Sequence, residues 1–574
     1  MKKLFIYIGL FFITVISFAE PILVSTNGET TIKFDTRYKK IVSAENRSEI
    51  IEKNIGEIEI GYILNNKIYY LRDILKSTGY LQNTNIIKLF SMVKGIKIYT
   101  YIYTPKFENI RYIYIYNEFI SDEMNKKVNI QSFYSIKKRE DGAVINDNLN
   151  KEYIYNKIYY KSLLDNSNLY LATEKDFENF KLKKIYDQKE KKDIENMIII
   201  NSVGKLESYD KKNDGIAIKF GKIKDEMDNL NIDYIIDNEV DDWSYWNENS
   251  EIKDKMILQD IILLKAAQDK NGLILSNSKD DNIVIEKYLY EIEAFIVTGH
   301  YAEAKKSLKY ILDKNLGMIY SYSYNIITKK LENRKSYHNF GVFLRVYSEY
   351  IDKSGDINFL KKYFRTIIGL IENRLFPEIK DGLLKDSYSN ENYGFYAISQ
   401  WLIYDGLEKF RNTIKFFAPK GLITKYETEM KLIKTTFNKT FFNRNYILDK
   451  LKSKSFNLRD IICIKNNFFN SNDVTKELLN FYTKNFKIKD ENGFSKILGG
   501  SLEDFWIELD VLDVYYELGL LEMAENLKNR IDNFSKSNSN ILPEYILHGG
   551  IKKYGDKGID YGVIAKYIVV NYGR

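Results

Sequence analysis

Two glutamates in loops before apolar helices are the residues of this sequence that could do chemistry together. Glu391 follows a run of turn residues and precedes Tyr393-Gly-Phe-Tyr396, and Glu544 stands in Leu542-Pro-Glu544. Taken alone, a loop glutamate is usually a solvated surface residue. Two carboxyl groups that face each other across a pocket, about 6.5–9.5 Å apart, are what inverting cleavage of a glycosidic bond requires.

The residues around each glutamate favour a functional site over a solvated surface loop. Pro543 is one of five prolines in the chain, and it fixes the backbone beside Glu544. Bulky aromatic residues, Tyr388 and Tyr393, flank Glu391. Such a setting removes water from a carboxyl group and favours its protonated form, which a general acid needs.

The elements that must position this pair are helices, because the hydrophobic period is about 3.6 residues from residue 252 onward. We expect twelve helical segments, with the pattern weakest in the eighth, near 252–269, 283–298, 301–313, 338–353, 357–373, 393–411, 422–437, 456–467, 473–485, 502–518, 520–535 and 559–571. Six helical hairpins predict an (α/α)6 toroid over residues 252–574. Its even-numbered helices would form the inner ring, so Glu391 and Glu544 would precede two opposed inner helices, the sixth and the twelfth.

An open helical-repeat solenoid is the alternative arrangement of these helices. Gly299-His-Tyr-Ala-Glu-Ala304 and Gly519-Leu-Leu-Glu-Met-Ala524 resemble short helix-pair repeats. However, the loops before the even-numbered helices are long, and no fixed period of about 34 residues is present. The pattern therefore favours the closed toroid.

The first half of the chain has a period of two residues. Stretches such as Ile96–Tyr103 and Ile110–Tyr116 are rich in β-branched and aromatic residues, with no helical segments between them. This pattern predicts an antiparallel β-sandwich over residues 20–236. The charged stretch 183–195 is expected to be a loop or a hairpin tip, and the acidic, Asn-rich residues 237–251 a linker.

The N-terminus has the features of a secretory signal peptide. A basic pair, Lys2-Lys3, precedes an apolar run from Leu4 to Phe18, and Ser17 and Ala19 suit cleavage before Glu20. We expect residues 1–19 to direct export to the periplasm or outside the cell; an uncleaved membrane anchor is the alternative. No later segment is long and apolar enough to cross a membrane.

Composition excludes several other function classes. The net charge of +7 is a small difference between 86 basic and 79 acidic residues spread along the chain, which does not predict a nucleic-acid partner. The single cysteine, Cys463, lies in an apolar pattern and is expected to be an inert core thiol. The three histidines lack metal-ligand spacing, and no phosphate-binding glycine loop is present. We therefore expect no metal and no organic cofactor.

Several of these motifs resemble the glucoamylase-like glycoside hydrolases, glycoside hydrolase family 15 of the six-hairpin glycosidase superfamily. Asp381-Gly-Leu383, Ser387-Tyr388, Glu391 and Gly394-Phe-Tyr396 look like the segment that carries the family's general acid, and Leu542-Pro-Glu544 looks like the loop of its general base. The resemblance covers most of the chain. It implies that Glu391 is the acid, that Glu544 is the base, and that α-linked oligosaccharides are cleaved from a chain end with inversion.

The sequence also departs from the family pattern. The family's Trp-x-Arg-Asp cluster at the second helix is replaced by Asn282–Leu289, and a Gln-x-Asp-x-Gly-like element at the fourth helix becomes Tyr337–Gly341. Asn390 stands where the family has a tryptophan before the acid. Catalytic carboxyls without the sugar-gripping cluster predict either a changed substrate or an inactive site.

The function predicted is thus an exported glycoside hydrolase with an oligosaccharide substrate. The alternatives are a catalytically inactive carbohydrate-binding relative and a helical scaffold for protein partners. Candidate substrate-binding residues are aromatic, amide or basic side chains expected at the mouth of the toroid: Tyr388, Tyr393, His338, Asn339, Trp506, Tyr545 and Lys287.

Overall fold

The computed structural model describes most of the chain after residue 21. The described residues are 22–46, 57–106, 112–122, 127–137, 150–154, 157–164, 167–173, 177–187, 192–220, 232–248, 250, 252–277, 282–326, 328–332, 335–387, 393–443, 446–451, 457–465, 468–469, 472–486, 502–537, 545–547 and 559–573. The predicted signal peptide lies outside these residues, and so do Glu391, Glu544 and Tyr388.

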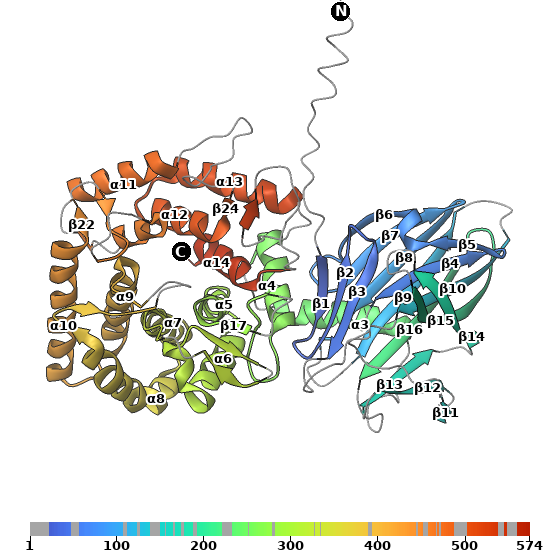
Figure 1. The fold of residues 1–574 in the computed structure, drawn as a ribbon, viewed down its shortest axis with the longest axis horizontal. Helices are drawn as coiled ribbons and strands as arrows, with labels where there is room; N and C mark the ends of the chain where they lie inside the picture. Colours follow the sequence, from blue (N-terminus) through green and yellow to red (C-terminus); the bar gives the residue numbers. More distant parts are fainter. Residues whose placement is uncertain are drawn as a thin grey trace, which may run out of the picture.

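The first half of the chain forms two antiparallel sheets of eight strands each (Figure 1). The first sheet contains β1 (Ile22–Thr26), β2 (Thr30–Asp35), β3 (Lys40–Asn46), β4 (Ile58–Leu64), β10 (Val128–Lys137), β15 (Lys192–Leu206) and β14 (Phe177–Asp187) in this order, with β5 (Lys67–Tyr70) beside β4. The order in the second is β11 (Asn150–Ile154), β12 (Lys157–Leu164), β13 (Ser167–Thr173), β16 (Lys211–Phe220), β9 (Tyr112–Ser121), β8 (Ile96–Tyr103), β7 (Ile87–Val93) and β6 (Leu75–Tyr80). A short helix, α2 (Leu71–Ile74), follows β5.

The two sheets share one core, which confirms the predicted sandwich. Alternate residues of β8, Ile96, Ile98 and Ile102, are fully buried, as a strand with one inward face requires. Tyr62 of the first sheet crosses this core and hydrogen-bonds Thr100 of the second at 2.5 Å. Of the charged stretch 183–195, residues 183–187 belong to β14 and 192–195 to β15, with Asp187 paired with Lys192.

The expected linker begins with a helix that the composition did not predict. Helix α3 (Ile232–Asn247) includes most of the acidic, Asn-rich stretch and lies between the two halves of the molecule (Figure 1). Its Trp243 is fully buried, and Trp246 stacks on His300 with ring centroids 4.1 Å apart. Tertiary packing of these two indoles outweighs the weak helix propensity of the surrounding residues.

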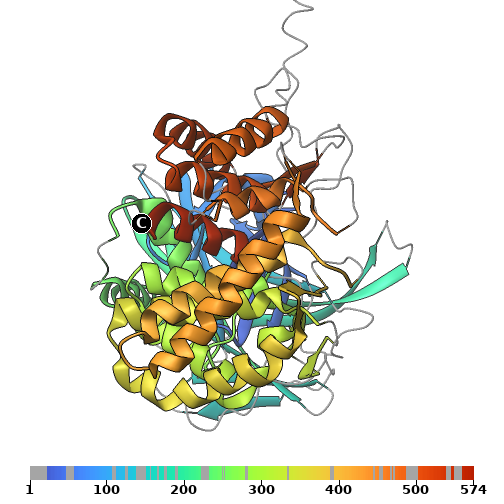
Figure 2. The same cartoon turned by 90° about the vertical axis from the view of Figure 1, so that its left-hand side faces the viewer.

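The second half of the chain is a double ring of helices (Figure 1), which Figure 2 shows from its side. The inner ring consists of α5 (Ile285–Val297), α7 (His338–Ser354), α9 (Ala397–Ile414), η4 (Leu458–Ile464), α12 (Phe505–Glu517) and α14 (Tyr561–Tyr572). The outer helices are α4 (Lys255–Ala267), α6 (Tyr301–Lys314), α8 (Ile357–Leu370), α10 (Lys420–Thr440), α11 (Asn472–Phe486) and α13 (Leu521–Ser537). All twelve predicted segments are helical, although the eighth is a short 3-10 helix, η4.

The inner ring closes. Each inner element contacts the next, and α14 packs against α5, so that the last helix meets the first. At this junction Gly562 lies so close to the side chain of Lys287 that a Cβ atom would overlap it, and Lys287 forms an ion pair with Asp560. The contact between α5 and α14 excludes an open solenoid.

Burial differs between the two rings as their positions require. Outer helices bury one stripe at helical spacing, as α10 does with Tyr426, Met430, Ile433 and Phe437. The inner helix α14 is buried on nearly all sides. Glycines allow the closest inner pair, α7 and α9, to approach, because a Cβ on Gly341 would overlap the backbone of Leu402.

Short β-structures connect several of these helices. They are β17 (Asn282–Val284), β18 (Ser323–Asn325), β19 (Lys330–Leu331), β20 (Ile379–Lys380), β21 (Leu383–Leu384), β22 (Phe442–Asn443), β23 (Tyr446–Ile447), β24 (Leu502–Asp504) and β25 (Tyr545–Leu547). Further single-turn segments are η1 (Leu316–Tyr320), η2 (Ile371–Leu375) and η3 (Phe376–Glu378). Across the described part of the chain, no helix combines the length and apolar character that a membrane crossing needs.

Candidate active site

The loop that contains Glu391 is fixed at both of its ends. Asp386 and Gly394 form an antiparallel bridge, with their backbone N–H groups donating to each other's carbonyls at 2.7 and 2.8 Å. Residue 394 is three positions before α9, the third inner helix. The two ends of the loop that carries the predicted acid therefore meet close to the N-terminal end of α9.

The chain next to Glu544 is fixed at the same end of the ring. Tyr545, Ile546 and Leu547 form β25, which pairs with β24, and Tyr545 lies opposite Asp504. Strand β24 runs directly into α12. The residue after the predicted base thus lies at the N-terminal end of the fifth inner helix, next to α14 in the ring.

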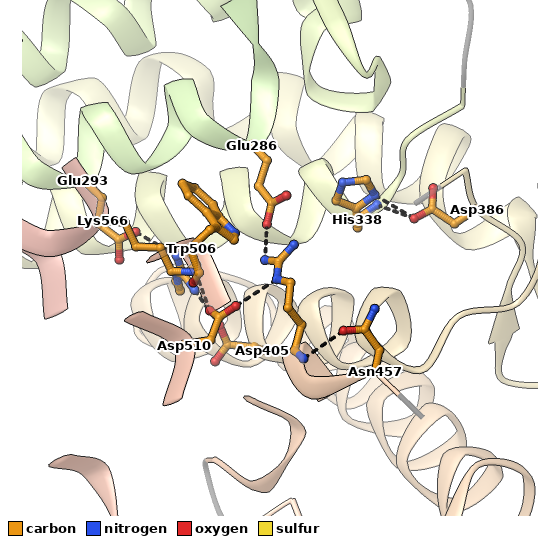
Figure 3. Close-up of polar contacts among 11 residues, drawn as sticks. Glu286, Glu293, His338, Asp386, Asp405, Asn457, Trp506, Asp510 and Lys566 are labelled. Atoms are coloured by element: carbon orange, nitrogen blue, oxygen red, sulfur yellow. Dashed lines mark hydrogen bonds and ion pairs between the residues drawn. The ribbon is translucent and has the colours of Figure 1, made fainter. Parts of the chain in front are cut away.

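Charged side chains from four inner elements meet inside the ring (Figure 3). Arg459 of η4 donates from Nη2 to Oε1 of Glu286 on α5 at 2.7 Å, and from Nε to Oδ2 of Asp510 on α12 at 2.8 Å. Asp510 also pairs with Lys566 of α14. The Nζ of Lys566 donates to the carbonyl of Trp506 at 2.9 Å. These contacts form one chain of alternating charge, which we call the inner charge chain: Glu286, Arg459, Asp510 and Lys566.

Burial and pairing set the charges of this chain. Burial alone would raise the pKa of Glu286, but Arg459 and then His338 outweigh it and lower the pKa to about 2. Glu286 is therefore an ionised carboxylate at neutral pH. Burial lowers the pKa of Lys566 to about 8, against the opposing effect of Asp510. The side chains of Glu286 and Arg459 are 13% and 11% exposed, whereas Asp510 and Lys566 are almost completely enclosed.

Trp506 stands among the cations of the inner charge chain. Lys566 Nζ lies 4.1 Å from the centre of its ring, and Tyr290 meets it edge-on at 5.2 Å. The indole is 7% exposed. Cation–π contact and ring packing hold this side chain in place.

The structure places the other predicted substrate-binding residues in different surroundings. Lys287 is paired with Asp560 at 2.7 Å, and Asn339 is buried and donates to the carbonyl of Ser321 at 2.8 Å. His338 is buried with its Nδ1 2.7 Å from Asp386, while Tyr393 is 40% exposed. Of Tyr545 the structure describes the backbone. Substrate contact by these residues remains a prediction.

A second charged group occupies the ring further from the loop anchors. Arg345 of α7 donates to Glu293 of α5 at 2.7 Å and lies 3.8 Å from Asp405 of α9. Burial raises the pKa of Glu349, one turn along α7, to about 7, and Glu293 adds to this effect. These contacts tie three consecutive inner helices together.

The inner charge chain was not predicted from the sequence, although two of its members carry a recognisable signal. Lys566 is the single basic residue of the otherwise apolar helix Tyr561–Tyr572, and a lone charge at a buried helix position requires a partner. Arg459 follows Asn457, which forms a capping box with Asp460. Glu286 and Asp510 carry no comparable signal.

Within the described residues, no three histidine, cysteine, aspartate or glutamate side chains are grouped as a metal site would require. Cys463 is fully buried in η4, and burial raises the pKa of its thiol. It is a free thiol inside the core, as the sequence predicted.

Comparison with known proteins identifies the fold. No protein-family model matches the sequence, and no curated protein is significantly similar to it. The structure is similar to a bacterial glucoamylase complexed with acarbose, with a TM-score of 0.70 and 12% identity, over 95% of this chain and 92% of that one. A rhamnosidase from Klebsiella oxytoca with rhamnose bound gives a TM-score of 0.47 and 8% identity, with 97% of each chain covered. A glycosidase in complex with glucose gives 0.46 and 11%, over 55% of this chain and 95% of that one.

The likeness to the glucoamylase extends over both halves of the molecule. At 12% identity it shows a shared fold, a β-sandwich followed by a six-hairpin helical ring. This agrees with the element order and the ring closure described above.

Proposed function

We propose that this protein is a glycoside hydrolase that removes sugar units from a chain end of α-linked oligosaccharides with inversion. Glu391 acts as the general acid and Glu544 as the general base. The observation that carries the proposal is the anchoring of the two loops. One is tied down by the Asp386–Gly394 bridge before α9, and the other by the Tyr545–Asp504 pair beside α14. The first anchor lies at the N-terminal end of the third inner element, α9, and the second at the N-terminal end of the fifth, α12.

Three described carboxyl groups near these anchors support the assignment of the acid by exclusion. Glu286 has a pKa of about 2, so it stays ionised and cannot donate a proton at neutral pH. Asp510 is bound by both Arg459 and Lys566. Asp386 is completely buried and accepts hydrogen bonds from His338 and Ser399. Of these three carboxyl groups, none combines access with a proton to give, which leaves Glu391 as the candidate acid.

The shared fold adds support of a general kind. The bacterial glucoamylase that shares it was determined with acarbose bound. A fold hosts many activities, so the argument for function rests on the two loops.

A catalytically inactive carbohydrate-binding protein is the second candidate. The observation that favours it lies at the start of α5, where the family resemblance leads one to expect a sugar-gripping Arg-Asp pair. The charged residues of this stretch are Glu286 and Lys287 instead, and their charges are engaged by Arg459 and Asp560. The third candidate, a helical scaffold, is disfavoured because the ring closes.

The experiment that separates these candidates is a hydrolysis screen. Purified protein without residues 1–19 is incubated with maltose, isomaltose, trehalose and longer α-linked oligosaccharides, and released sugar is measured. Glu391→Gln and Glu544→Gln are expected to lower kcat by at least about 100-fold, since each removes an acid or base function. Asp241→Asn, on the exposed face of α3, is the matched control and should retain full activity. Saturable sugar binding without hydrolysis by the wild type would favour the inactive relative.

We also propose that the protein is exported and loses residues 1–19. N-terminal sequencing of the mature protein tests this proposal. A mature chain that begins at Glu20 supports cleavage, and one that retains Lys2-Lys3 contradicts it.

A further inference from the structure

One completely buried carboxylate joins two inner helices to the loop of the predicted acid. Oδ1 of Asp386 accepts from the backbone N–H of Tyr337 at 2.7 Å. Its Oδ2 accepts from Nδ1 of His338 at 2.7 Å and from the hydroxyl of Ser399 at 2.6 Å. Asp386 thereby contacts the first turn of α7 and the first turn of α9.

Asp386 performs for α7 the task of an N-cap residue. Tyr337, at the N-cap position, makes no side-chain capping bond. The carboxylate of Asp386 instead accepts from Tyr337 N and, at 3.4 Å, from His338 N. A negative group at this end also complements the helix dipole. The helix is capped by a residue that comes 49 positions later in the chain.

The backbone of the same residue fixes the loop. Asp386 pairs with Gly394 through two hydrogen bonds, and the next residue, Ser387, donates from its backbone N–H to the carbonyl of Lys335 at 3.0 Å. The hydroxyl of Ser336 donates to the carbonyl of Ser387 at 3.1 Å. The entry to the loop is therefore bound to the segment before α7, and its exit at Gly394 is bound to Asp386.

The partner of this carboxylate is a histidine whose charged form the neighbouring carboxylates favour. Burial would lower the pKa of His338, but Asp386 and then Glu286 outweigh burial and raise it. Arg459, from η4, is the cation that opposes them. A buried imidazolium at a helix N-terminus is unfavourable without a carboxylate, so His338 and Asp386 depend on each other.

We propose that Asp386 and His338 are a positioning pair that fixes Ser387 and Gly394, the described residues on either side of the loop, relative to the inner ring. This inference rests on the proposed function, because Glu391 belongs to that loop. Both side chains are buried and bound to each other, so the pair would act through the loop. It holds the loop through the bridge to Gly394, and a small displacement of a catalytic group is enough to cost about 100-fold in rate.

The test compares three single variants with a matched control. Asp386→Asn and His338→Leu remove the ion pair, whereas His338→Gln keeps a donor for Asp386. We expect the first two to lower kcat by about 10- to 100-fold with KM changed less than threefold, and His338→Gln to recover part of that loss. The pH dependence of kcat in Asp386→Asn should also differ from that of the wild type. Ser348→Ala, which removes a buried hydrogen bond further along α7, should leave kcat unchanged.

Hydrogen exchange gives a readout that does not depend on activity. Exchange of the peptide spanning residues 384–397 should quicken in Asp386→Asn and His338→Leu, and match the wild type in Ser348→Ala. Near-wild-type thermal midpoints would show that the fold persists.

The outcomes separate the two proposals. If the wild type cleaves glycosides and both pair variants keep wild-type kcat, pH profile and exchange, the positioning role is overturned and the proposed function stands. If the wild type cleaves none of the substrates, the proposed function fails. Exchange in residues 384–397 then decides the positioning role, with faster exchange supporting it and unchanged exchange overturning it.

Discussion

Arg459 and Glu286 meet inside the ring, 173 residues apart in sequence, with Nη2 and Oε1 2.7 Å from each other. The same guanidinium binds Asp510 through Nε. One planar cation thus joins α5, η4 and α12. The shortest inner element, η4, is held in the ring by its charge as well as by its apolar contacts.

Loss of this cation should destabilise the helical ring strongly. Arg459→Met leaves Glu286 without its ion pair and Asp510 with Lys566 alone. Uncompensated buried charges cost about 3–5 kcal/mol, so urea unfolding should show a loss of that order. Arg374→Met, at an exposed position, is the matched control and should stay within about 0.5 kcal/mol of the wild type. Equal stability of the two variants would contradict a structural role for the inner charge chain.

Glu286 should contribute to acid sensitivity. Its pKa is about 2, below its ordinary value of 4.5, so its stabilising effect is complete above pH 4.5 and is lost as the pH falls toward 2. The stability difference between the wild type and Glu286→Gln should therefore shrink over this range. Denaturant midpoints measured at several acidic pH values check this. A difference that stays constant with pH would be inconsistent with the ion pair to Arg459.

Glu291 should destabilise the fold as it stands. Its carboxyl group on α5 is fully buried, and neither oxygen has a hydrogen-bond partner among the described residues. Glu291→Met removes a buried unpaired polar group, and an increase of about 1–3 kcal/mol in unfolding free energy is expected.

The control for Glu291 and its pH dependence sharpen this prediction. Burial raises the pKa of Glu291, so its protonated form is favoured in the fold and wild-type stability falls as the pH rises. The advantage of Glu291→Met should therefore grow with pH. Glu525→Met, at an exposed position of α13, should change stability little. A lower unfolding free energy in Glu291→Met would contradict the prediction and show that the carboxyl group of Glu291 has a stabilising partner in the fold.

Glu239 should make the contact between the two halves of the molecule sensitive to pH. Its carboxylate accepts from the backbone of Lys106 at 2.9 Å and from Nε1 of Trp243 at 2.9 Å. Burial raises its pKa to about 7 from 4.5. The stability linked to Glu239 is present below pH 4.5 and is lost as the pH rises through 7.

Thermal unfolding between pH 4.5 and 8 tests this sensitivity. Glu239→Gln keeps an oxygen acceptor without a titrating proton, so its midpoint should fall less with pH than that of the wild type. Asp241→Asn, on the exposed face of the same helix, should follow the wild type. Parallel curves for Glu239→Gln and the wild type would contradict the prediction.

The sequence was a good guide to those elements whose own residues set their structure. The apolar period of α14 predicted 559–571, and the helix spans Tyr561–Tyr572. The region of η4 was weakest in pattern because only seven residues are helical there, started by the Asn457–Asp460 capping box. Helix α3 was missed because packing of Trp243 and Trp246, rather than local propensity, stabilises it.

The candidate site was likewise predictable from the sequence only in part. Counting helices was enough to predict that the loops of Glu391 and Glu544 precede the third and sixth inner helices, and the facing of the two carboxyl groups stays a prediction. The inner charge chain could not be predicted by counting helices, because Glu286 and Arg459 become neighbours only when the ring closes. Lys287 was predicted to bind substrate, but in the structure it forms an ion pair with Asp560. This pair depends on the contact between α14 and α5, which the sequence pattern does not show.

The most direct test of the proposed function is the configuration of the first sugar released. Proton NMR of the anomeric region, recorded during the first turnovers of an α-linked oligosaccharide, distinguishes inversion from retention. The β-anomer should appear first, and Glu391→Gln and Glu544→Gln should abolish its appearance on the same time scale. Release of the α-anomer, or wild-type rates in both variants, would contradict the assignment of these two glutamates as an inverting acid and base.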